Sequence, residues 1–412
     1  MNRQLTWCRN WRQIIGGVAA LVAAVVLVGG SVVGGAPAAH AAPTTPHTAA
    51  MPLFGAPHET GKVTLPEWSI DGPALWTQGQ PSAPVGPLMV LAWTGTDHRL
   101  NYMFGNGGIH SFISDSKRTL GETSFLRPAV VRGIGEGGFT APVALAWLGT
   151  DSGHHLNVLY SAPGSTSKKL TLWSDSSFTS PSLEWLSVSD QGGTLLLAWA
   201  GTDTGHSLNI MQIRVTSQGL AQGPKTTYWN YHSAGQPELI QDRTFSSPNR
   251  YFLGWSDVTS HRIMWAVSPD AKTWTQQPSF AERSGSGPSL MGLNEQLTHY
   301  PQFWMAWADM RTDMRTDTSP RVNILYAPTY TQATTNNVKA TLPETALGGP
   351  VVGFNLYQPG QELVIAWTGT DSLHHINITA SRRDGMAEVR GEVTSWLIRL
   401  RISFSRGSPS GT

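Results

Sequence analysis

Short, almost continuously apolar runs that end in tryptophan recur along this chain. Two of them read VALAW from Val143 and LLLAW from Leu195, and each is followed by a Gly-Thr-Asp turn and a second run that begins Leu-Asn. The pattern returns at intervals of 52 to 60 residues, and its six marker tryptophans are Trp93, Trp147, Trp199, Trp255, Trp307 and Trp367. A recurrence of this length is typical of a propeller, solenoid or array in which each copy is one supersecondary unit.

Each unit contains four strand-like segments. A segment marked by proline comes first, for example RPAV from Arg127, and the tryptophan run, the Leu-Asn run and a Lys-x-Thr-Leu run follow it. Four strands in each of six units predict an all-β fold, a six-bladed β-propeller of four-stranded antiparallel blades. The unbroken apolar second strand fits this fold, because a neighbouring blade covers each of its faces. The turn after the second strand and the crossover to the next blade should emerge on one face, which we call the turn face.

The repeat begins out of phase. KVTLPE at Lys62–Glu67 matches the fourth-strand segments RTLGETS from Arg118 and KATLPETA from Lys339. Lending this strand to the last blade would close the ring and leave no open sheet edge. We therefore expect residues 63–67 to form the outer strand of the blade built from residues 349–381. The alternative is the tail, where residues 396–404 alternate between apolar and polar positions, but the tail does not match the repeat.

The N-terminal segment of the chain indicates export. Three arginines precede an apolar run from Ile14 to Val33, and Ala39-His40-Ala41 offers a cleavage site, so residues 1–41 read as a signal peptide. An uncleaved run of this length would anchor the chain in a membrane. We expect residues 42–61 to be a disordered leader, 62–385 the propeller, and 386–412 a basic tail or an extra strand. The predicted localisation is extracellular.

Composition narrows the classes of function. Charged residues make up 13% of the chain, whereas glycine (43) and tryptophan (17) are abundant, which favours short strands and turns over helices. The 28 basic and 27 acidic side chains nearly balance, so nothing predicts nucleic-acid binding. Cys8 is the only cysteine and precedes the apolar run of the signal. A mature chain would therefore have neither disulfides nor thiol chemistry.

The Gly-Thr-Asp turns, each with a histidine just before the next strand, are the repeated candidate site. In a structural interpretation glycine supplies a positive φ, threonine and aspartate cap the turn, and histidine packs or bonds across to the neighbouring turn. In a functional interpretation the carboxylate and imidazole bind sugar hydroxyls, and several equivalent shallow sites compensate for weak affinity. The candidate residues are Asp97, His98, Asp151, His154, Asp203, His206, Asp371 and His374. No ligand pattern supports a metal, and no cofactor is predicted.

Carboxylates suited to hydrolysis do not stand out. Glycoside cleavage needs two acids in one cleft with different environments. Glu122 and Glu344 occupy equivalent positions of the repeat, so on a ring they lie too far apart and are too alike. The insertion Asp309–Asp317 duplicates MRTD, and its aspartates, four residues apart, do not match the spacing of a calcium loop.

The segment Ser268–Trp274, SPDAKTW, resembles the Asp-box S-x-D-G-x-T-W of sialidase-like propellers, with Ala271 in place of glycine. The LAWTGTD…LN frame also resembles that of exported bacterial propeller proteins. These resemblances imply the propeller fold over about residues 62–385, with the box on the side opposite the active face. They do not imply hydrolysis, because arginines such as Arg118, Arg127 and Arg132 are scattered and form no sialidase-type triad.

The sequence therefore predicts an extracellular binding or scaffold module whose ligand is a carbohydrate or cell-envelope polymer. One alternative is a sialidase-like glycoside hydrolase with a central cleft, which would hold two unlike carboxylates about 5 to 10 Å apart. Another is a protein-interaction platform, which would expose an apolar patch of several hundred Å² on one face.

Overall fold

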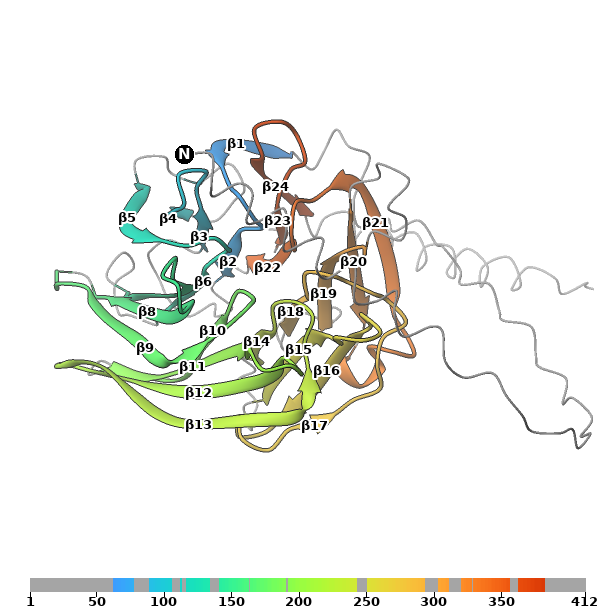
Figure 1. The fold of residues 1–412 in the computed structure, drawn as a ribbon. Helices are drawn as coiled ribbons and strands as arrows, with labels where there is room; N and C mark the ends of the chain where they lie inside the picture. The colour runs from blue at the N-terminus through green and yellow to red at the C-terminus, as the bar shows by residue number, and fades with distance from the viewer. Residues whose placement is uncertain are drawn as a thin grey trace, which may run out of the picture. The chain divides into compact units, whose positions relative to one another are not determined.

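The computed structural model describes residues 62–77, 89–105, 112, 116–133, 141–162, 164–189, 192–242, 250–292, 303–310, 320–327, 329–355 and 362–381. They form six sheets, each of four antiparallel strands, which confirms the predicted six-bladed β-propeller (Figure 1). The predicted signal peptide, leader and tail, and most of the Asp309–Asp317 insertion, lie outside these residues. Within the described ranges no helix has the length and apolar character needed to span a membrane.

The strands follow the repeat in chain order. Blade 1 consists of β2 (Ala74–Thr77), β3 (Met89–Thr94), β4 (Arg99–Gly105) and β5 (Arg118–Thr123), and blade 2 of β6 (Ala129–Arg132), β7 (Val143–Leu148), β8 (His155–Ser161) and β9 (Lys168–Ser176). Blade 3 consists of β10 (Ser182–Ser189), β11 (Gly192–Ala200), β12 (Ser207–Thr216) and β13 (Gly219–His232), and blade 4 of β14 (Glu238–Asp242), β15 (Arg250–Ser256), β16 (Ile263–Ser268) and β17 (Thr275–Gln276).

Blade 5 consists of β18 (Ser289–Gly292), β19 (Phe303–Ala308), β20 (Arg321–Ala327) and β21 (Val338–Thr345), with the short 3₁₀ helix η4 (Tyr330–Gln332) before β21. Blade 6 consists of β22 (Val351–Asn355), β23 (Glu362–Thr368), β24 (His375–Ser381) and, as its fourth strand, β1 (Val63–Trp68). The first strands β2, β6, β10, β14, β18 and β22 contact one another in this order, and β22 contacts β2. The six blades therefore surround a common axis.

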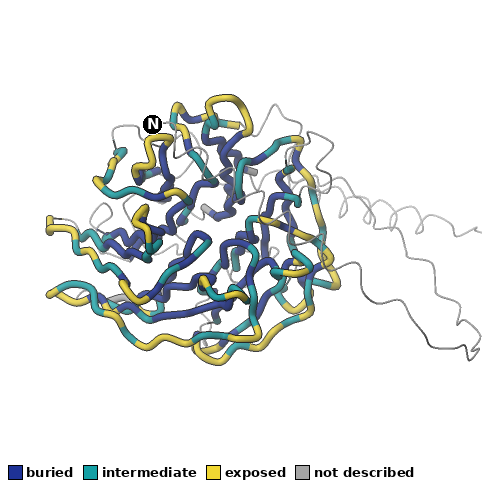
Figure 2. Tube along the Cα trace, viewed as in Figure 1, coloured by how far each residue is buried: buried dark blue, intermediate teal, exposed yellow. Residues whose placement is uncertain are grey.

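The second strands form the core. Every residue of β3, β7 and β19 is buried, and the six marker tryptophans are at most 2% exposed. A buried indole removes about 200 Å² from water, which contributes roughly 4 to 6 kcal/mol as an upper estimate. Figure 2 shows that the inner strands are buried and that the outer strands and turns are more exposed. The apolar run needs no alternation because both faces of the strand are covered.

The chain's first strand closes the ring. β1 pairs antiparallel with β24, with Val63 opposite Ile378 and Thr64 opposite Asn377, and Thr64 Oγ1 donates to Asn377 Oδ1 at 2.8 Å. The predicted closure by the N-terminal segment is therefore confirmed. The competing tail segment, residues 396–404, lies outside the described residues.

A lysine at the outer edge of a blade covers that blade's marker tryptophan and reaches back to the preceding blade. Lys169 Nζ lies 5.4 Å from the ring centre of Trp147 and 2.6 Å from Glu122 Oε2 of blade 1. We call this arrangement the rim latch. The other four latches join Lys62 to Glu344, Lys117 to Glu67, Lys225 to Asp175 and Lys339 to Glu282. Glu122 and Glu344, considered above as hydrolytic acids, are therefore latch residues.

Candidate functional site

The Gly-Thr-Asp turns lie on the same face as the crossovers, as predicted. The carbonyl of His98 accepts the N–H of the crossover residue Ser124 at 2.9 Å, and His206 and Ser233 repeat this bond at 3.1 Å. Buried serine side chains also hydrogen-bond the crossover to the next blade, since Ser177 Oγ donates to the carbonyl of Thr179 in the crossover and to that of Ala200 on β11. Turn and crossover are thus one hydrogen-bonded unit in blades 1, 2, 3, 4 and 6.

The aspartates of the turns cap them, as the structural interpretation predicts. Asp151 Oδ1 accepts the N–H groups of Gly153 at 3.0 Å and His155 at 3.4 Å. The carboxylates of Asp97, Asp203 and Asp371 accept equivalent backbone bonds. Burial alone would raise the pKa of Asp151, but the hydrogen bonds from His155 and Gly153 outweigh it and hold this pKa below its usual value.

Two details of that interpretation are wrong. The residues with positive φ are the histidines, with φ 64° at His98, 49° at His154, 51° at His206, 55° at His261 and 58° at His374, and the glycines of the turns are not among them. Glycine is needed for close approach instead, because a Cβ on Gly149 would lie 2.4 Å from Asp151 Oδ2. Threonine does not cap the turn either: Thr150 Oγ1 lies 2.8 Å from Thr123 Oγ1 of the preceding blade.

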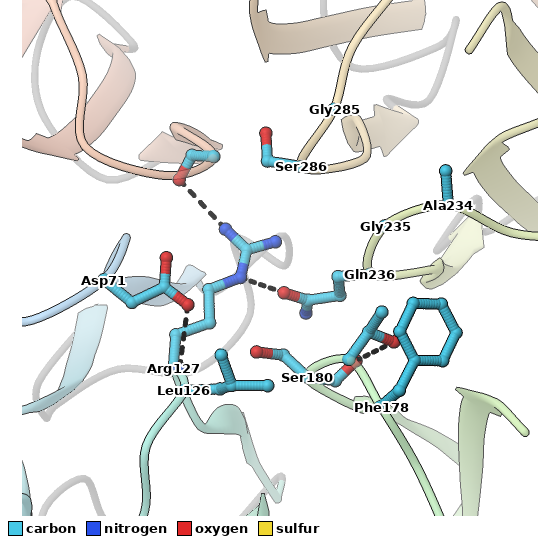
Figure 3. A pocket seen from close by; sticks show the side chains of 12 residues that line it. Asp71, Leu126, Arg127, Phe178, Ser180, Ala234, Gly235, Gln236, Gly285 and Ser286 are labelled. Carbon is cyan, nitrogen blue, oxygen red and sulfur yellow. Dashed lines mark hydrogen bonds between the residues drawn. The ribbon is translucent and has the colours of Figure 1, made fainter. Parts of the chain in front are cut away.

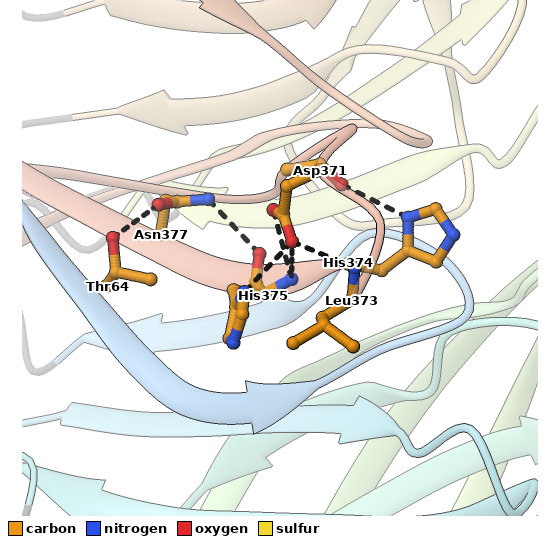
Figure 4. Close-up of polar contacts among 7 residues, drawn as sticks. Thr64, Asp371, Leu373, His374, His375 and Asn377 are labelled. Atoms are coloured by element: carbon orange, nitrogen blue, oxygen red, sulfur yellow. Dashed lines mark hydrogen bonds and ion pairs between the residues drawn. The ribbon is translucent and has the colours of Figure 1, made fainter.

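The aspartate and histidine pairs also differ from those predicted. Asp151 Oδ1 lies 2.6 Å from Nδ1 of His155, and Asp371 Oδ1 lies 2.9 Å from Nδ1 of His375, so the partner is the histidine after the predicted one (Figure 4). The imidazole of His206 instead packs on Phe178, with ring centroids 3.8 Å apart, and that of His98 packs on Phe125 at 5.1 Å. The predicted histidines therefore shape the turn.

Exposed tryptophans stand beside both aspartate–histidine pairs. Trp173, on β9, is 73% exposed, and its indole lies 5.0 Å from His155 in an edge-to-face arrangement. Trp68, at the end of β1, is 45% exposed and lies 6.4 Å from His375. Sequence reasoning missed all four of these side chains. The available signal was the segment KLTLWSDSS, whose tryptophan stands where the copies from Lys62, Arg118 and Lys339 have proline or glycine.

A cavity of about 250 Å³ lies where the six crossovers meet at the axis, and each blade contributes to its lining (Figure 3). Arg127 crosses it, 3% exposed, and donates from Nη1 to the carbonyl of Gly349 at 3.0 Å and from Nε to Gln236 Oε1. Arg127 is one of several arginines that are scattered along the sequence, but the fold places it at the axis. It connects blades 2, 4 and 6.

The lining of this cavity contains one carboxylate, Asp71. Its Oδ1 accepts the N–H of Gly72 at 2.7 Å, and its Oδ2 accepts the N–H of Arg127 at 3.2 Å. Glu238, on β14, does not line the cavity, and burial raises its pKa to about 7, although the charge of Arg127 opposes the shift. The residues that line the cavity therefore lack the pair of unlike carboxylates that retaining or inverting hydrolysis uses.

The Ser268–Trp274 segment forms a tight turn after β16. Asp270 Oδ1 accepts the N–H groups of Thr273 at 2.7 Å and Lys272 at 2.8 Å, and these bonds lower the pKa of Asp270 to about 2. Ala271 has φ 58°, a conformation that favours glycine. The segment is therefore a turn held by its own aspartate, and its kinship with the Asp-box stays a prediction.

No protein-family model and no curated protein matches this chain. Among solved structures, an arginine-to-alanine triple mutant of AofleA from Arthrobotrys oligospora is 11% identical, with a TM-score of 0.49, and the match covers 79% of this chain and 86% of that one. The six-bladed fucose-recognising lectin of Aleuria aurantia is 9% identical, with a TM-score of 0.46 and coverages of 75% and 91%. Trypanosoma rangeli sialidase is 10% identical, with a TM-score of 0.42 and coverages of 88% and 63%. These likenesses assign no ligand to this chain.

Proposed function

We propose that this chain is an exported glycan-binding propeller whose principal site is Trp173 with the Asp151–His155 pair. The observation that supports it is the position of an indole, 73% exposed, against a histidine whose other side is hydrogen-bonded to a carboxylate. An exposed indole offers a flat apolar face on which the C–H face of a sugar ring can pack. Carboxylate and imidazole at its edge can bond the hydroxyls that such a ring carries.

Blade 6 supports a second site of the same composition. Trp68, His375 and Asp371 belong to β1, β24 and the turn that joins β23 to β24, so this site depends on the strand that closes the ring. Two shallow sites on one rigid ring would strengthen attachment to a repetitive surface such as a cell-envelope polymer. The remaining candidates from the sequence, namely Asp97, His98, His154, Asp203, His206 and His374, stay predicted ligand residues with established roles in their turns.

The two alternatives have less support. A glycoside hydrolase would need two unlike carboxylates in the axial cavity. The residues that line this cavity include a single carboxylate, Asp71. A protein-interaction platform would need a contiguous apolar patch. Among the described residues the exposed large apolar side chains number five, namely Trp68, Phe125, Trp173, Trp229 and Leu373. They lie on different turns and strands of the ring.

The test is retention of the exported protein on insoluble chitin, cellulose and peptidoglycan sacculi, together with a microarray of soluble glycans. We expect at least one of these probes to bind, and Trp173→Ala and His155→Ala to weaken that binding at least about tenfold. Phe125→Ala is the matched control, because it removes an exposed aromatic ring from another turn. Absence of binding to every probe, or equal binding by Trp173→Ala and the native protein, would overturn the proposal.

A further inference from the structure

The fourth strands of two adjacent blades, 2 and 3, contain a longer β-bulge than those of blades 1, 5 and 6. In every blade except blade 4 a threonine of this strand donates to the asparagine of the third strand at 2.6 to 2.8 Å, which fixes a common register. Beyond this threonine, Leu120 of β5 lies four residues before the crossover residue Ser124. Leu172 of β9, in contrast, lies five residues before the crossover residue Ser177. Tyr228 of β13 likewise lies five residues before the crossover residue Ser233. The β-bulge is therefore one residue longer in blades 2 and 3.

The longer bulge begins with tryptophan in both blades. Trp173 and Trp229 occupy equivalent positions, and Trp229 is 68% exposed, so these two are the most exposed of the large apolar side chains that the structure describes. Blades 6, 1 and 5 have Pro66, Gly121 and Pro343 at this position. Pro66, Gly121 and Pro343 are exposed too, so this position faces solvent in all five blades, and an indole fills it in blades 2 and 3.

The fold does not require this extra residue. The shorter bulges of blades 6, 1 and 5 still deliver Glu67, Glu122 and Glu344 to their rim latches. In blade 2 the latch carboxylate, Asp175, lies two residues after Trp173 and pairs with Lys225 of β13. Exposing two indoles therefore adds nothing to closure of the ring, and it places apolar surface in water. A ligand that covered the two indoles would remove this apolar surface from water.

The two tryptophans stand on the outer strands of adjacent blades. β9 and β13, the fourth strands of blades 2 and 3, are in direct contact. The Lys225–Asp175 pair holds the two strands together, and Lys168 Nζ donates to the carbonyl of Ser217 at 3.2 Å. A ligand that reached both bulges would have to run along this edge from blade 2 to blade 3.

The surroundings of the two indoles favour a neutral, hydroxyl-rich ligand. The residues that follow them in the bulges, Ser174 and Asn230, are exposed and uncharged. Tyr228 and Tyr231 flank Trp229 and stack on each other, with ring centroids 5.8 Å apart and planes inclined by 13°. Tyr231 in turn stacks on the buried Trp255, which anchors this bulge to the core. The bulge therefore presents aromatic side chains that pack on the core through Tyr231, with polar groups beside them.

We infer that Trp173 and Trp229 are two subsites of one binding surface, and that its ligand is an extended glycan chain that lies across blades 2 and 3. This inference rests on the proposed function and deepens it, because it names a polymer of sugar units where the proposal names a glycan. A single sugar ring occupies one indole. A chain long enough to reach both subsites binds more tightly, because the second contact is intramolecular.

The test is titration with size-fractionated fragments, from one unit to eight, of whichever polysaccharide the native protein retains in the first assay. We expect affinity to rise at least about tenfold between fragments that reach one indole and fragments that reach both. Trp229→Ala and Trp173→Ala each abolish this rise, so that either variant binds long fragments no more tightly than short ones. Phe125→Ala again serves as the control.

A second measurement does not depend on how the variants fold. Long fragments should protect both Trp173 and Trp229 of the native protein from oxidation by N-bromosuccinimide, as read from peptide masses. Affinity independent of fragment length, or protection of Trp173 with full oxidation of Trp229, overturns the inference and leaves the proposed function intact. Failure of every polysaccharide to bind overturns both.

Discussion

Tyr231 stacks on Trp255, with ring centroids 4.8 Å apart and planes inclined by 26°. Trp255 is the marker tryptophan of blade 4, and Tyr231 stands in blade 3 where Asp175, a latch carboxylate, stands in blade 2. In the five other blades a lysine covers the marker tryptophan. At this junction an aromatic ring from the preceding blade takes the lysine's place, and a stacked pair replaces an ion pair.

Replacing Tyr231 by alanine should destabilise the fold by about 2 kcal/mol, because the stack is lost and Trp255 gains contact with water. The free energy of unfolding from guanidinium titration measures this. Trp229→Ala, two residues away on the same strand, is the control and should change it by less than about 0.5 kcal/mol, since that indole is exposed. Equal effects of the two variants would contradict the stack as the closing element of this junction.

The rim latch between Lys169 and Glu122 should contribute modestly. Both side chains are about one-third exposed, so solvent screens their pairing, while the alkyl stem of Lys169 also covers Trp147. A double-mutant cycle with Lys169→Met and Glu122→Gln should give a coupling energy of about 0.5 to 1 kcal/mol at low salt. The coupling should fall when the titrations are repeated in 1 M salt. A coupling that is independent of salt would mean that packing alone holds the pair.

The turn geometry predicts opposite tolerances at two positions of blade 2. His154→Asn should cost little, because asparagine adopts positive φ readily, whereas His154→Val should cost about 2 kcal/mol. Gly149→Ala should also cost about 2 kcal/mol or more, since its Cβ would meet the Asp151 carboxylate and Asn157 Nδ2. Thermal unfolding of the three variants decides the matter. A destabilising His154→Asn with a harmless Gly149→Ala would reverse the assignment of roles in the turn.

Stability should fall as pH rises from about 4.5 to 7. Burial raises the pKa of Glu238 from 4.5 to about 7, and that of Asp242 from 3.8 to about 6, so in this window the folded state binds protons that the unfolded state has released. Each such group contributes a slope of at most about 1.4 kcal/mol per pH unit. Glu238→Gln should flatten the profile of unfolding free energy against pH, and Asp242 should account for the slope that remains.

Arg127 provides an independent check on that prediction. Its charge opposes the shift at Glu238, so Arg127→Met should raise the pKa of Glu238 further and extend the falling limb above pH 7. A profile that Glu238→Gln leaves unchanged would show that other groups produce the slope.

The fold was predictable because the same physical demand is met six times. Each blade must bury one indole between two neighbours, so the marker tryptophans and the four segments around them repeat along the chain. Closure was predictable for the same reason, since KVTLPE carries a fourth-strand pattern ahead of the first blade. The turns were predicted in outline only. Histidine holds the left-handed conformation, whereas the glycine of the turn is required for the close approach of aspartate and asparagine.

The candidate site was harder to predict because its signals are not local. Arg127 precedes a proline as Ser180 and Gln236 do, and its partners come from blades more than 100 residues away in the sequence. Trp173 stands in a bulge that is one residue longer than those of blades 1, 5 and 6, and the bulge itself shows only when the strand register is known. His155 pairs with Asp151 because the turn brings positions four apart together, whereas sequence reasoning chose the more regularly repeated His154.

The pairing of β1 with β24 joins residues more than 300 positions apart, so the last blade cannot be completed until both ends of the propeller have been synthesised. Until then the earliest strand has an unsatisfied backbone and β24 presents a bare edge to any other chain. A circular permutant that starts at Gly349 and carries Val63–Trp68 directly after β24 would make every blade contiguous. That rearranged gene should yield the same architecture with faster refolding and less aggregation.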